Sequence, residues 1–326
     1  MMCFRNLVCL AAAVLGSSAI QLHHGPKQGM KVPRISGEYI TVYRAAGDFF
    51  PGPDTSELKA GRRYEVWVPN DHTIVKGPDG RWNMFGITHP LTSPNVIHEG
   101  EFQSFHALAP AGALKDVISA GAWKDLPKVL RASDRPGENP DFYAPFVIQR
   151  GSLYYMFYGP NPIRLATSPD LQIWTPQGAL FSDGPTSRDP DVMLWKGVYY
   201  LVYCVENRVV IRTSTDLRHW GTPRTILQMK DGIAPESPSL AREDGGFYLF
   251  VCIWNGIWDR RTVEGAYQHH TYVYRSDDLL SFEGGREVTV LDSHAPEVFQ
   301  GEDGQWYISS AEWPRRGVSI AKLAWE

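Results

Sequence analysis

The chain has 326 residues, of which 43% are hydrophobic and 21% charged, so it can fold as a globular protein with a substantial core. The formal net charge is −4, and the sequence has no basic run or stripe, which argues against a nucleic-acid partner. Beyond the first residues, no segment is long and apolar enough to cross a membrane.

The N-terminus has the pattern of a secretory signal peptide. Arg5 precedes an apolar run from Leu7 to Gly16, which is too short to span a bilayer, and small residues follow up to Ala19. A short membrane anchor is the alternative interpretation. We expect residues 1–19 to be cleaved, which leaves a secreted or periplasmic protein without a membrane span.

Residues 20–36 are polar and contain glycine and proline, so we expect a loose leader there. Residues 37–326 are expected to form a single catalytic domain. Its first element is a strand at residues 38–43, where apolar and polar side chains alternate. One helical turn is expected near residues 113–120.

A phrase of two parts recurs five times along this domain. A polar pair, an anchor residue and a short apolar strand come first, and a turn with an aromatic-rich strand follows. The five lead-ins, each a polar pair with its anchor, are Asn70-Asp71-His72, Tyr143-Ala144-Pro145, Arg188-Asp189-Pro190, Glu236-Ser237-Pro238 and His294-Ala295-Pro296. Successive anchors are 73, 45, 48 and 58 residues apart.

Short β-branched and aromatic runs between glycine, proline and Ser/Asp turns predict antiparallel strands, four to each copy of the phrase. Five copies predict an all-β fold, a five-bladed β-propeller of four-stranded antiparallel blades. A β-sandwich does not explain a phrase that recurs in fixed order. A second recurring phrase, with Asp170 and Trp174 in one copy and Asp216 and Trp220 in another, is expected to form blade-edge turns and packing.

The lead-ins should converge at one end of the propeller axis, because the first strand of each blade is innermost. They would bring together the three carboxylates of Asp71, Asp189 and Glu236. Neighbouring carboxylates suit glycosidic bond cleavage, in which one acid donates a proton and another activates water or attacks the sugar. The alternatives are that these side chains cap strand ends, or that the acids bind a metal ion, which Arg188 in the same ring disfavours.

These residues resemble the three-acid signature of the five-bladed glycosidases of glycoside hydrolase family 43 and its clan relative, family 32. The resemblance covers about residues 64–326, and the stretch that follows Tyr143 is especially similar to blade two of family 43. It implies that Glu236 is the general acid. It implies that Asp71 is the general base of an inverting enzyme or the nucleophile of a retaining one. Asp189 would orient the sugar and raise the pKa of the acid.

Substrate contacts are expected from the remaining side chains of the ring and from the insertion in blade four. The expected substrate-binding residues are Asn70, Tyr143, Arg188, His294 and Trp254. Trp254, Trp258 and the pair His269-His270 would form a sugar-stacking wall or a packed loop core. The resemblance requires no cofactor, and the one metal it implies is a calcium ion near the axis beside His294.

Two features depart from the family pattern or leave a choice open. The first lead-in has Asn-Asp-His where both families have Asp-Pro, and Arg-Asp-Pro in the third is closer to family 32. Asp191 rivals Asp189, which is preferred because it shares its repeat position with Asp71. His98 and His106 would lie beside the converging lead-ins, or else on the surface or in the core. Glu297 would add a subsite contact.

The sequence therefore predicts an exported glycosidase that cleaves furanosides or pentosides of oligo- or polysaccharides, such as arabinofuranosides or xylosides, by inversion. A retaining fructofuranosidase-like enzyme is the first alternative. A non-catalytic carbohydrate-binding propeller is the alternative from another class.

Overall fold

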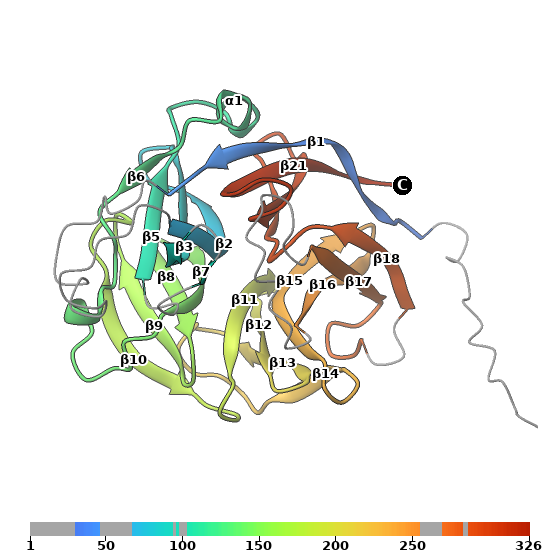
Figure 1. Ribbon diagram of the computed structural model, residues 1–326. Helices are drawn as coiled ribbons and strands as arrows, with labels where there is room; N and C mark the ends of the chain where they lie inside the picture. The colour runs from blue at the N-terminus through green and yellow to red at the C-terminus, as the bar shows by residue number, and fades with distance from the viewer. Residues whose placement is uncertain (1–29, 46–66, 94–95, 98–102, 255–268, 283–285) are drawn as a thin grey trace, which may run out of the picture. The chain divides into compact units, whose positions relative to one another are not determined.

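The computed structural model describes residues 30–45, 67–93, 96–97, 103–254, 269–282 and 286–326 (Figure 1). The chain divides into a unit of residues 1–30 and a unit of residues 31–326, and the architecture below is that of the second unit. The expected signal peptide at residues 1–19 lies outside the described residues. Within the described ranges, no helix has the length and apolar character needed to span a bilayer.

The strands form five antiparallel sheets, and β2, β7, β11 and β15 lie nearest the centre of the ring (Figure 1). Blade I contains β2 (Trp67–Lys76), β3 (Trp82–Ser93), β5 (Gln103–Leu108) and β6 (Lys124–Leu126), with β4 (Val96–Ile97) paired to β3. Blade II contains β7 (Tyr143–Arg150), β8 (Leu153–Gly159), β9 (Ile163–Ser168) and β10 (Thr175–Phe181). Blade III contains β11 (Arg188–Trp195), β12 (Val198–Val205), β13 (Arg208–Ser214) and β14 (Arg224–Gln228).

The last two blades complete the predicted five-bladed propeller. Blade IV contains β15 (Ala234–Glu243), β16 (Gly246–Trp254), β17 (His270–Ser276) and β18 (Arg286–Asp292). Blade V contains β19 (Val298–Gln300), β20 (Trp306–Ala311), β21 (Val318–Trp325) and β1 (Pro33–Tyr43). A helix α1 (Leu114–Ala120) and a 3₁₀ turn η2 (Ala132–Asp134) lie between β5 and β7, so the helical turn expected near 113–120 is confirmed.

The N-terminal strand closes the ring, because β1 is the outermost strand of blade V and pairs antiparallel with β21. The pairing begins with Pro33 opposite Trp325, inside the stretch 20–36 where we expected a loose leader. Strand β1 therefore starts four residues before the expected boundary at residue 37. Its polar start is compatible with a strand because an outermost strand buries little surface.

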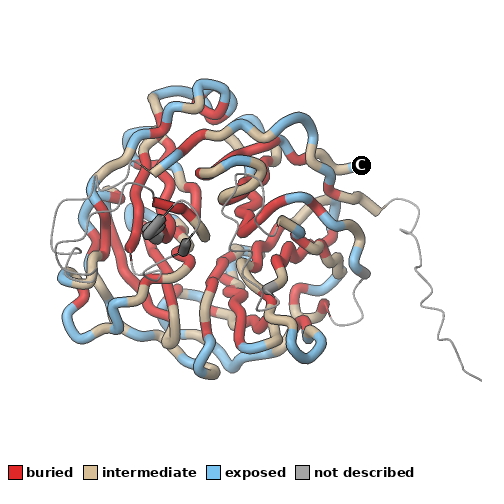
Figure 2. The backbone as a smooth tube through the Cα atoms, in the orientation of Figure 1, coloured by how far each residue is buried: buried red, intermediate tan, exposed pale blue. Residues whose placement is uncertain are grey.

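The core lies between blades rather than within one layer. Most buried hydrophobic residues of the described chain form five clusters, one at each interface between neighbouring blades. Trp174 of blade II packs edge-on against Phe85 of blade I at 5.6 Å, and Trp220 of blade III packs against Phe157 of blade II at 5.7 Å. Figure 2 shows buried backbone along the inner and middle strands and exposed backbone at the turns. The packing role predicted for these tryptophans is confirmed.

The lead-ins share a β-bulge, which decides where their side chains go. In blade III, Arg188 pairs with Cys204 and Asp191 with Val202, so the ladder skips the two residues between them. Blades I, II and IV show the same shift. The residue before each proline has a left-handed backbone, with φ of 37° at Ala144, 59° at Asp189, 46° at Ser237 and 43° at Ala295. A bulge interrupts the alternation of side chains and re-aims them.

The bulge of blade I lies one residue earlier than that of blade III, because it skips Asn70 and Asp71 where blade III skips Asp189 and Pro190. The bonds between blades nevertheless keep the predicted equivalence. Ile74 N and Leu240 N, each two residues past its anchor, donate to the residue that follows the anchor of the preceding blade. Asp71 and Asp189 each directly precede an anchor and border the same axial cavity, so the prediction that they share a repeat position is confirmed.

Directly below the lead-ins, polar side chains join blades I, III, IV and V each to the next blade; we call Thr73, Asp191, Ser239 and Glu297 the axial layer. Asp191 accepts a hydrogen bond from the backbone N–H of Leu240 at 2.9 Å, and Ser239 accepts one from Val298 at 3.3 Å. Glu297 accepts bonds from Ile74 N at 2.5 Å and from Thr73 Oγ1 at 3.2 Å. Thr73 in turn accepts one from Val147 N at 3.3 Å. An inner strand has unpaired backbone groups along the edge that faces the axis, and the axial layer forms hydrogen bonds with some of these groups.

Candidate active site

The side chains of the lead-ins meet at one end of the axis, which we call the mouth. Arg188 is the cation among them. Its Nε lies 3.3 Å from Asp189 Oδ2, its Nη2 lies 3.3 Å from Glu236 Oε1, and Nη2 also donates to Pro235 O at 3.0 Å. Burial lowers the pKa of Arg188, but nearby charges, first that of Asp189 and also those of Glu236 and Asp71, outweigh this and raise it. Arg188 is therefore a fixed positive charge between two carboxylates of neighbouring blades.

Ser237 connects the other carboxylates. Its backbone N–H donates to Asp189 Oδ2 at 3.2 Å, and its hydroxyl donates to Asp71 Oδ1. The residue next to Glu236 thus holds both remaining acids of the predicted triad. Sequence inspection placed Ser237 in a lead-in without a role, and its position directly after Glu236 was the signal available.

Asn70 and His294 form a third link, with Asn70 Oδ1 lying 3.0 Å from His294 Nε2. His72 turns away from the mouth. Its Nδ1 lies 3.0 Å from Asn70 O and its Nε2 lies 2.7 Å from Ser309 Oγ. Burial lowers the pKa of His72 to about 4, so this imidazole is neutral at physiological pH.

Two cavities lie beside these residues. A pocket of about 810 Å³ opens between blades II, III and IV. It is lined by Asn139, Asp141, Tyr143, Pro160, Asn161, Pro185, Thr186, Arg188, Glu206, Asn207, Gly232, Ile233, Ala234 and Glu236. A second cavity of about 30 Å³ lies on the axis, where Asp71 and Asp189 face Asp191 and Glu297. The axial cavity is too small for a sugar ring, whereas the first pocket is large enough for sugar units.

The exposure of the three acids follows this division. The side chain of Glu236 is 27% exposed and borders the large pocket, whereas that of Asp189 is 7% exposed and borders the axial cavity. Asp71 also borders the axial cavity and is half-buried. Glu236 is therefore the acid that a ligand in the pocket would meet first.

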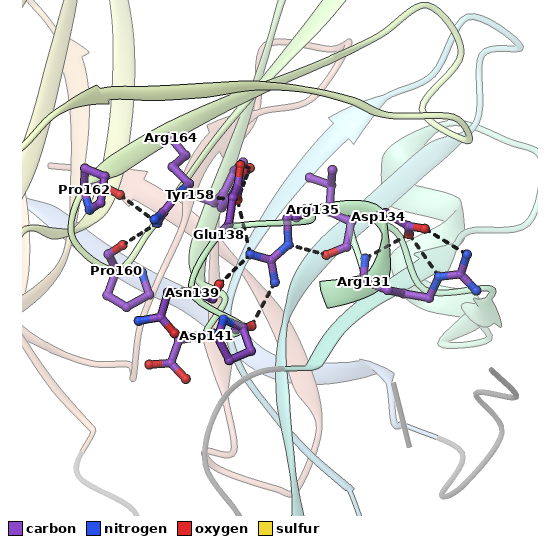
Figure 3. Close-up of polar contacts among 12 residues, drawn as sticks. Arg131, Asp134, Arg135, Glu138, Asn139, Asp141, Tyr158, Pro160, Pro162 and Arg164 are labelled. Carbon is purple, nitrogen blue, oxygen red and sulfur yellow. Dashed lines mark hydrogen bonds and ion pairs between the residues drawn. The ribbon is translucent and has the colours of Figure 1, made fainter. Parts of the chain in front are cut away.

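The blade II wall of the pocket is built around Arg135, whose side chain is fully buried (Figure 3). Arg135 donates to the backbone oxygens of Leu130 at 2.8 Å, Asn139 at 3.0 Å and Pro140 at 2.8 Å. Glu138 lies 3.3 Å from the guanidinium and accepts a bond from the Tyr158 hydroxyl. These contacts fix the segment that presents Asn139 and Asp141 to the pocket, polar side chains that sequence inspection did not single out.

Other expected residues lie elsewhere or have other partners. His106 is buried, 2.8 Å from Asn83 Oδ1, and stacks on Phe85, which is a structural role. Glu297 belongs to the axial layer and does not border the large pocket, so the expected subsite contact is corrected. Trp254 ends β16, and its side chain lies outside the described residues, as do His98 and Trp258.

The calcium ion implied by the resemblance would lie beside His294. The described residue that lies against its Nε2 is Asn70, which offers one amide oxygen. Among the described residues, the group of three or more His, Cys, Asp or Glu side chains close enough to hold a metal ion is His269, His270 and Asp292. Calcium takes six to eight oxygen ligands, so the described residues around His294 do not fit such a site.

Comparison with known proteins gives the family context. The profile of glycosyl hydrolases family 43 matches residues 185–325, which include Arg188, Asp189 and Glu236 but not Asn70 or Asp71. A xylosidase/arabinosidase of Butyrivibrio fibrisolvens is 24% identical over 265 residues, which are 74% of this chain and 43% of the relative. An extracellular endo-α-(1→5)-L-arabinanase of Thermotoga petrophila is 26% identical over 184 residues, which are 44% of this chain and 38% of the relative. The chain thus spans less than half the length of both relatives.

The solved structures agree with the fold. The α-L-arabinanase of Cellvibrio cellulosa, solved with arabinohexaose, superposes with a TM-score of 0.59 and 15% identity over 79% of this chain and 93% of its own. The comparisons support the prediction of a glycosidase, since the matching family is one of glycosyl hydrolases and both relatives are named as such enzymes. The chain is a five-bladed β-propeller. Over residues 185–325, its sequence resembles that of the glycosyl hydrolases of family 43.

Proposed function

We propose that the protein is a glycoside hydrolase that cleaves pentosides, with α-L-arabinofuranosides and β-D-xylosides as first candidates. One observation carries the proposal. Three carboxylates from blades I, III and IV are linked through Arg188 and Ser237 at the mouth, and Glu236 borders a pocket large enough for sugar units. The names of the matched relatives support arabinose and xylose as the sugars.

In the proposed mechanism Glu236 donates a proton to the leaving glycosidic oxygen, and Asp71 activates the water that attacks the anomeric carbon. A guanidinium bonded to a carboxylate favours its ionised form. Arg188 therefore has to leave Glu236 when the substrate binds, and a sugar hydroxyl is a suitable new partner. Asp189 then remains beside Arg188 and keeps the cation from returning to Glu236.

The stereochemistry follows from the role of Asp71. Inversion is proposed, with Asp71 acting through water, and retention with Asp71 as a nucleophile is the alternative. Retaining pairs lie about 5–5.5 Å apart, whereas inverting pairs lie about 6.5–9.5 Å apart to leave room for water. Proton NMR of the first-formed anomer separates the two mechanisms.

The test is turnover of aryl arabinofuranosides and aryl xylosides by the purified full chain and by Glu236→Gln and Asp71→Asn. Each variant is expected to lose at least about 1000-fold in kcat while keeping the wild-type Tm. Matched controls are Glu287→Gln and Asp277→Asn, which make the same changes on exposed residues of blade IV away from the mouth. Near wild-type turnover by either mouth variant would refute its assigned role.

A non-catalytic carbohydrate-binding propeller is the second candidate, and two contacts favour it. Arg188 holds Glu236 in an ion pair, and the Ser237 hydroxyl occupies one oxygen of Asp71. Under this alternative, calorimetry detects arabino- or xylo-oligosaccharide binding, with no product released from any of them. Glu236→Gln then changes affinity only.

We also propose that the protein is exported. The apolar N-terminal run and the extracellular arabinanase among its relatives support this proposal. Expression of the full chain in a bacterial host, followed by N-terminal sequencing of the periplasmic or culture fraction, tests it. A mature N-terminus near residue 20 is expected, whereas an uncleaved cytoplasmic product would contradict it.

A further inference from the structure

Two histidines and one aspartate meet at the edge of blade IV, outside the site described above. His270 begins β17 and Asp292 ends β18, and the two residues are directly opposite one another in the ladder. His269 Nε2 lies 3.6 Å from Asp292 Oδ1, and His270 Nδ1 lies 3.5 Å from the same oxygen. Both distances exceed those of ordinary N–H···O hydrogen bonds, which are about 2.7–3.2 Å.

These separations match the spacing of ligands around a zinc ion. Zinc binds imidazole nitrogen and carboxylate oxygen at about 2.0–2.2 Å, so two ligands in a tetrahedral site lie about 3.4 Å apart. The ligand atoms of all three residues lie within 4.8 Å of one another. Two imidazoles and one carboxylate are also a donor set that zinc prefers, and three protein ligands leave a fourth position for water or another ligand.

The fold places the three residues side by side before any ion arrives. The ring of His269 stacks on Trp313 at 4.6 Å with an interplanar angle of 13°, and the carbonyl of His269 accepts a bond from Ser293 N at 2.6 Å. The pairing of β17 with β18 holds the backbones of His270 and Asp292 opposite one another. The side chains of His270 and Asp292 are 60% and 57% exposed, so an ion can reach them from solvent.

We propose that His269, His270 and Asp292 form a site for a divalent transition-metal ion, with zinc as the preferred ion. The ion joins His270, the first residue of β17, and the preceding His269 to Asp292, the last residue of β18. The lead-in that carries His294 follows shortly after. This proposal is independent of the glycosidase function, because none of its ligands belongs to the mouth.

The experiment uses the full chain without a histidine tag, treated with chelator and titrated with ZnCl₂ against a chromophoric competitor. One strong site per chain is expected, together with a rise in Tm of a few degrees at a hundredfold excess over Kd. His270→Ala and Asp292→Asn should each weaken zinc binding by more than about tenfold. His219→Ala is the matched control and should bind zinc as the wild type does. This exposed histidine pairs with Asp216 at 2.7 Å, and no third donor from the described part of the chain joins the pair.

Cobalt reports the coordination geometry of the bound ion, which the zinc titration does not. Co²⁺ bound by the wild type should show the intense visible absorption of a tetrahedral ion, and Asp292→Asn should lose it. Absence of a strong zinc site in the wild type would overturn the proposal. Zinc affinity unchanged in both His270→Ala and Asp292→Asn would also overturn it, because the ion would then be held by other residues.

Discussion

Two layers of carboxylates, which lie on opposite sides of the anchor residues of the lead-ins, have opposite environments. In the mouth, Arg188 and Ser237 connect Asp189 to Glu236 and Asp71, and Glu236 borders an open pocket. In the axial layer, Asp191 and Glu297 are buried and accept backbone hydrogen bonds from the next blade.

The difference between the layers shows that an acid in a lead-in is not a catalytic candidate by type alone. Asp189 and Asp191 are two residues apart, yet one contacts a cation at the mouth and the other completes the edge of a neighbouring strand. The side of the anchor residue on which an acid lies decides its partner. Each prediction below changes one layer and measures whether the other responds.

Glu297→Ala should have the largest effect on stability. It removes the acceptor for Ile74 N and for the Thr73 hydroxyl, and leaves buried donors unpaired. The free energy of unfolding should fall by about 3–5 kcal/mol in chemical denaturation. Turnover per folded molecule should stay close to wild type. A stability loss below about 1 kcal/mol would show that the axial layer does not hold blades I and V together.

Asp191→Asn should change how stability depends on pH. Burial raises the pKa of Asp191 to about 7, above its value in the unfolded chain. The folded protein therefore holds a proton that the unfolded chain has lost, and stability from this group is present at low pH and disappears as the pH rises through about 7.

The variant lacks this titration and keeps an acceptor for Leu240 N. Its unfolding free energy relative to wild type should rise by on the order of 3 kcal/mol between pH 5 and pH 8. His72, whose pKa is lowered to about 4 by burial, is present in both proteins, so its contribution cancels. Parallel pH profiles for the two proteins would contradict the burial of a protonated Asp191.

Asp189→Asn should act on turnover instead. Asparagine keeps an acceptor for Ser237 N but removes the charge beside Arg188. Arg188 is then free to remain on Glu236, so kcat/KM for an aryl pentoside should fall by about 100-fold, which corresponds to about 2.7 kcal/mol. The Tm should change by only a few degrees. Full activity in this variant would show that Asp189 has no role in turnover.

Ser237→Ala should have a smaller effect on turnover, a loss of about tenfold in kcat. The hydroxyl bonded to Asp71 favours the ionised carboxylate, so its removal should also move the acidic limb of the kcat/KM profile to higher pH. Ser237→Thr retains a hydroxyl and should restore both values in part. An unchanged pH profile in Ser237→Ala would show that Ser237 does not position Asp71.

The propeller was predictable because its signal repeats. Five lead-ins and the paired residues Asp170 and Trp174 recur at blade spacing, and each expected feature was found. The closing strand β1 was only partly predicted, since Pro33–Ser36 carry little apolar signal.

The direction in which the lead-in side chains point was the part of the site that the sequence did not disclose. A bulge leaves no mark in residue spacing, so the sequence did not show that Asp189 contacts Arg188 whereas Glu297 accepts a bond from Ile74 N. Glu297 was therefore expected to contact the substrate. Hydrogen bonds between blades, such as those of Ser237, link residues far apart in the chain and have no local pattern.

The most direct test compares one substitution in both layers, Glu236→Gln at the mouth and Glu297→Gln on the axis, by turnover and Tm measured on the same preparations. Glu236→Gln should abolish turnover of the best aryl pentoside and leave the Tm unchanged. Glu297→Gln should lower the Tm and retain turnover. The reverse result, with activity lost only in Glu297→Gln, would contradict the assignment of chemistry to the mouth.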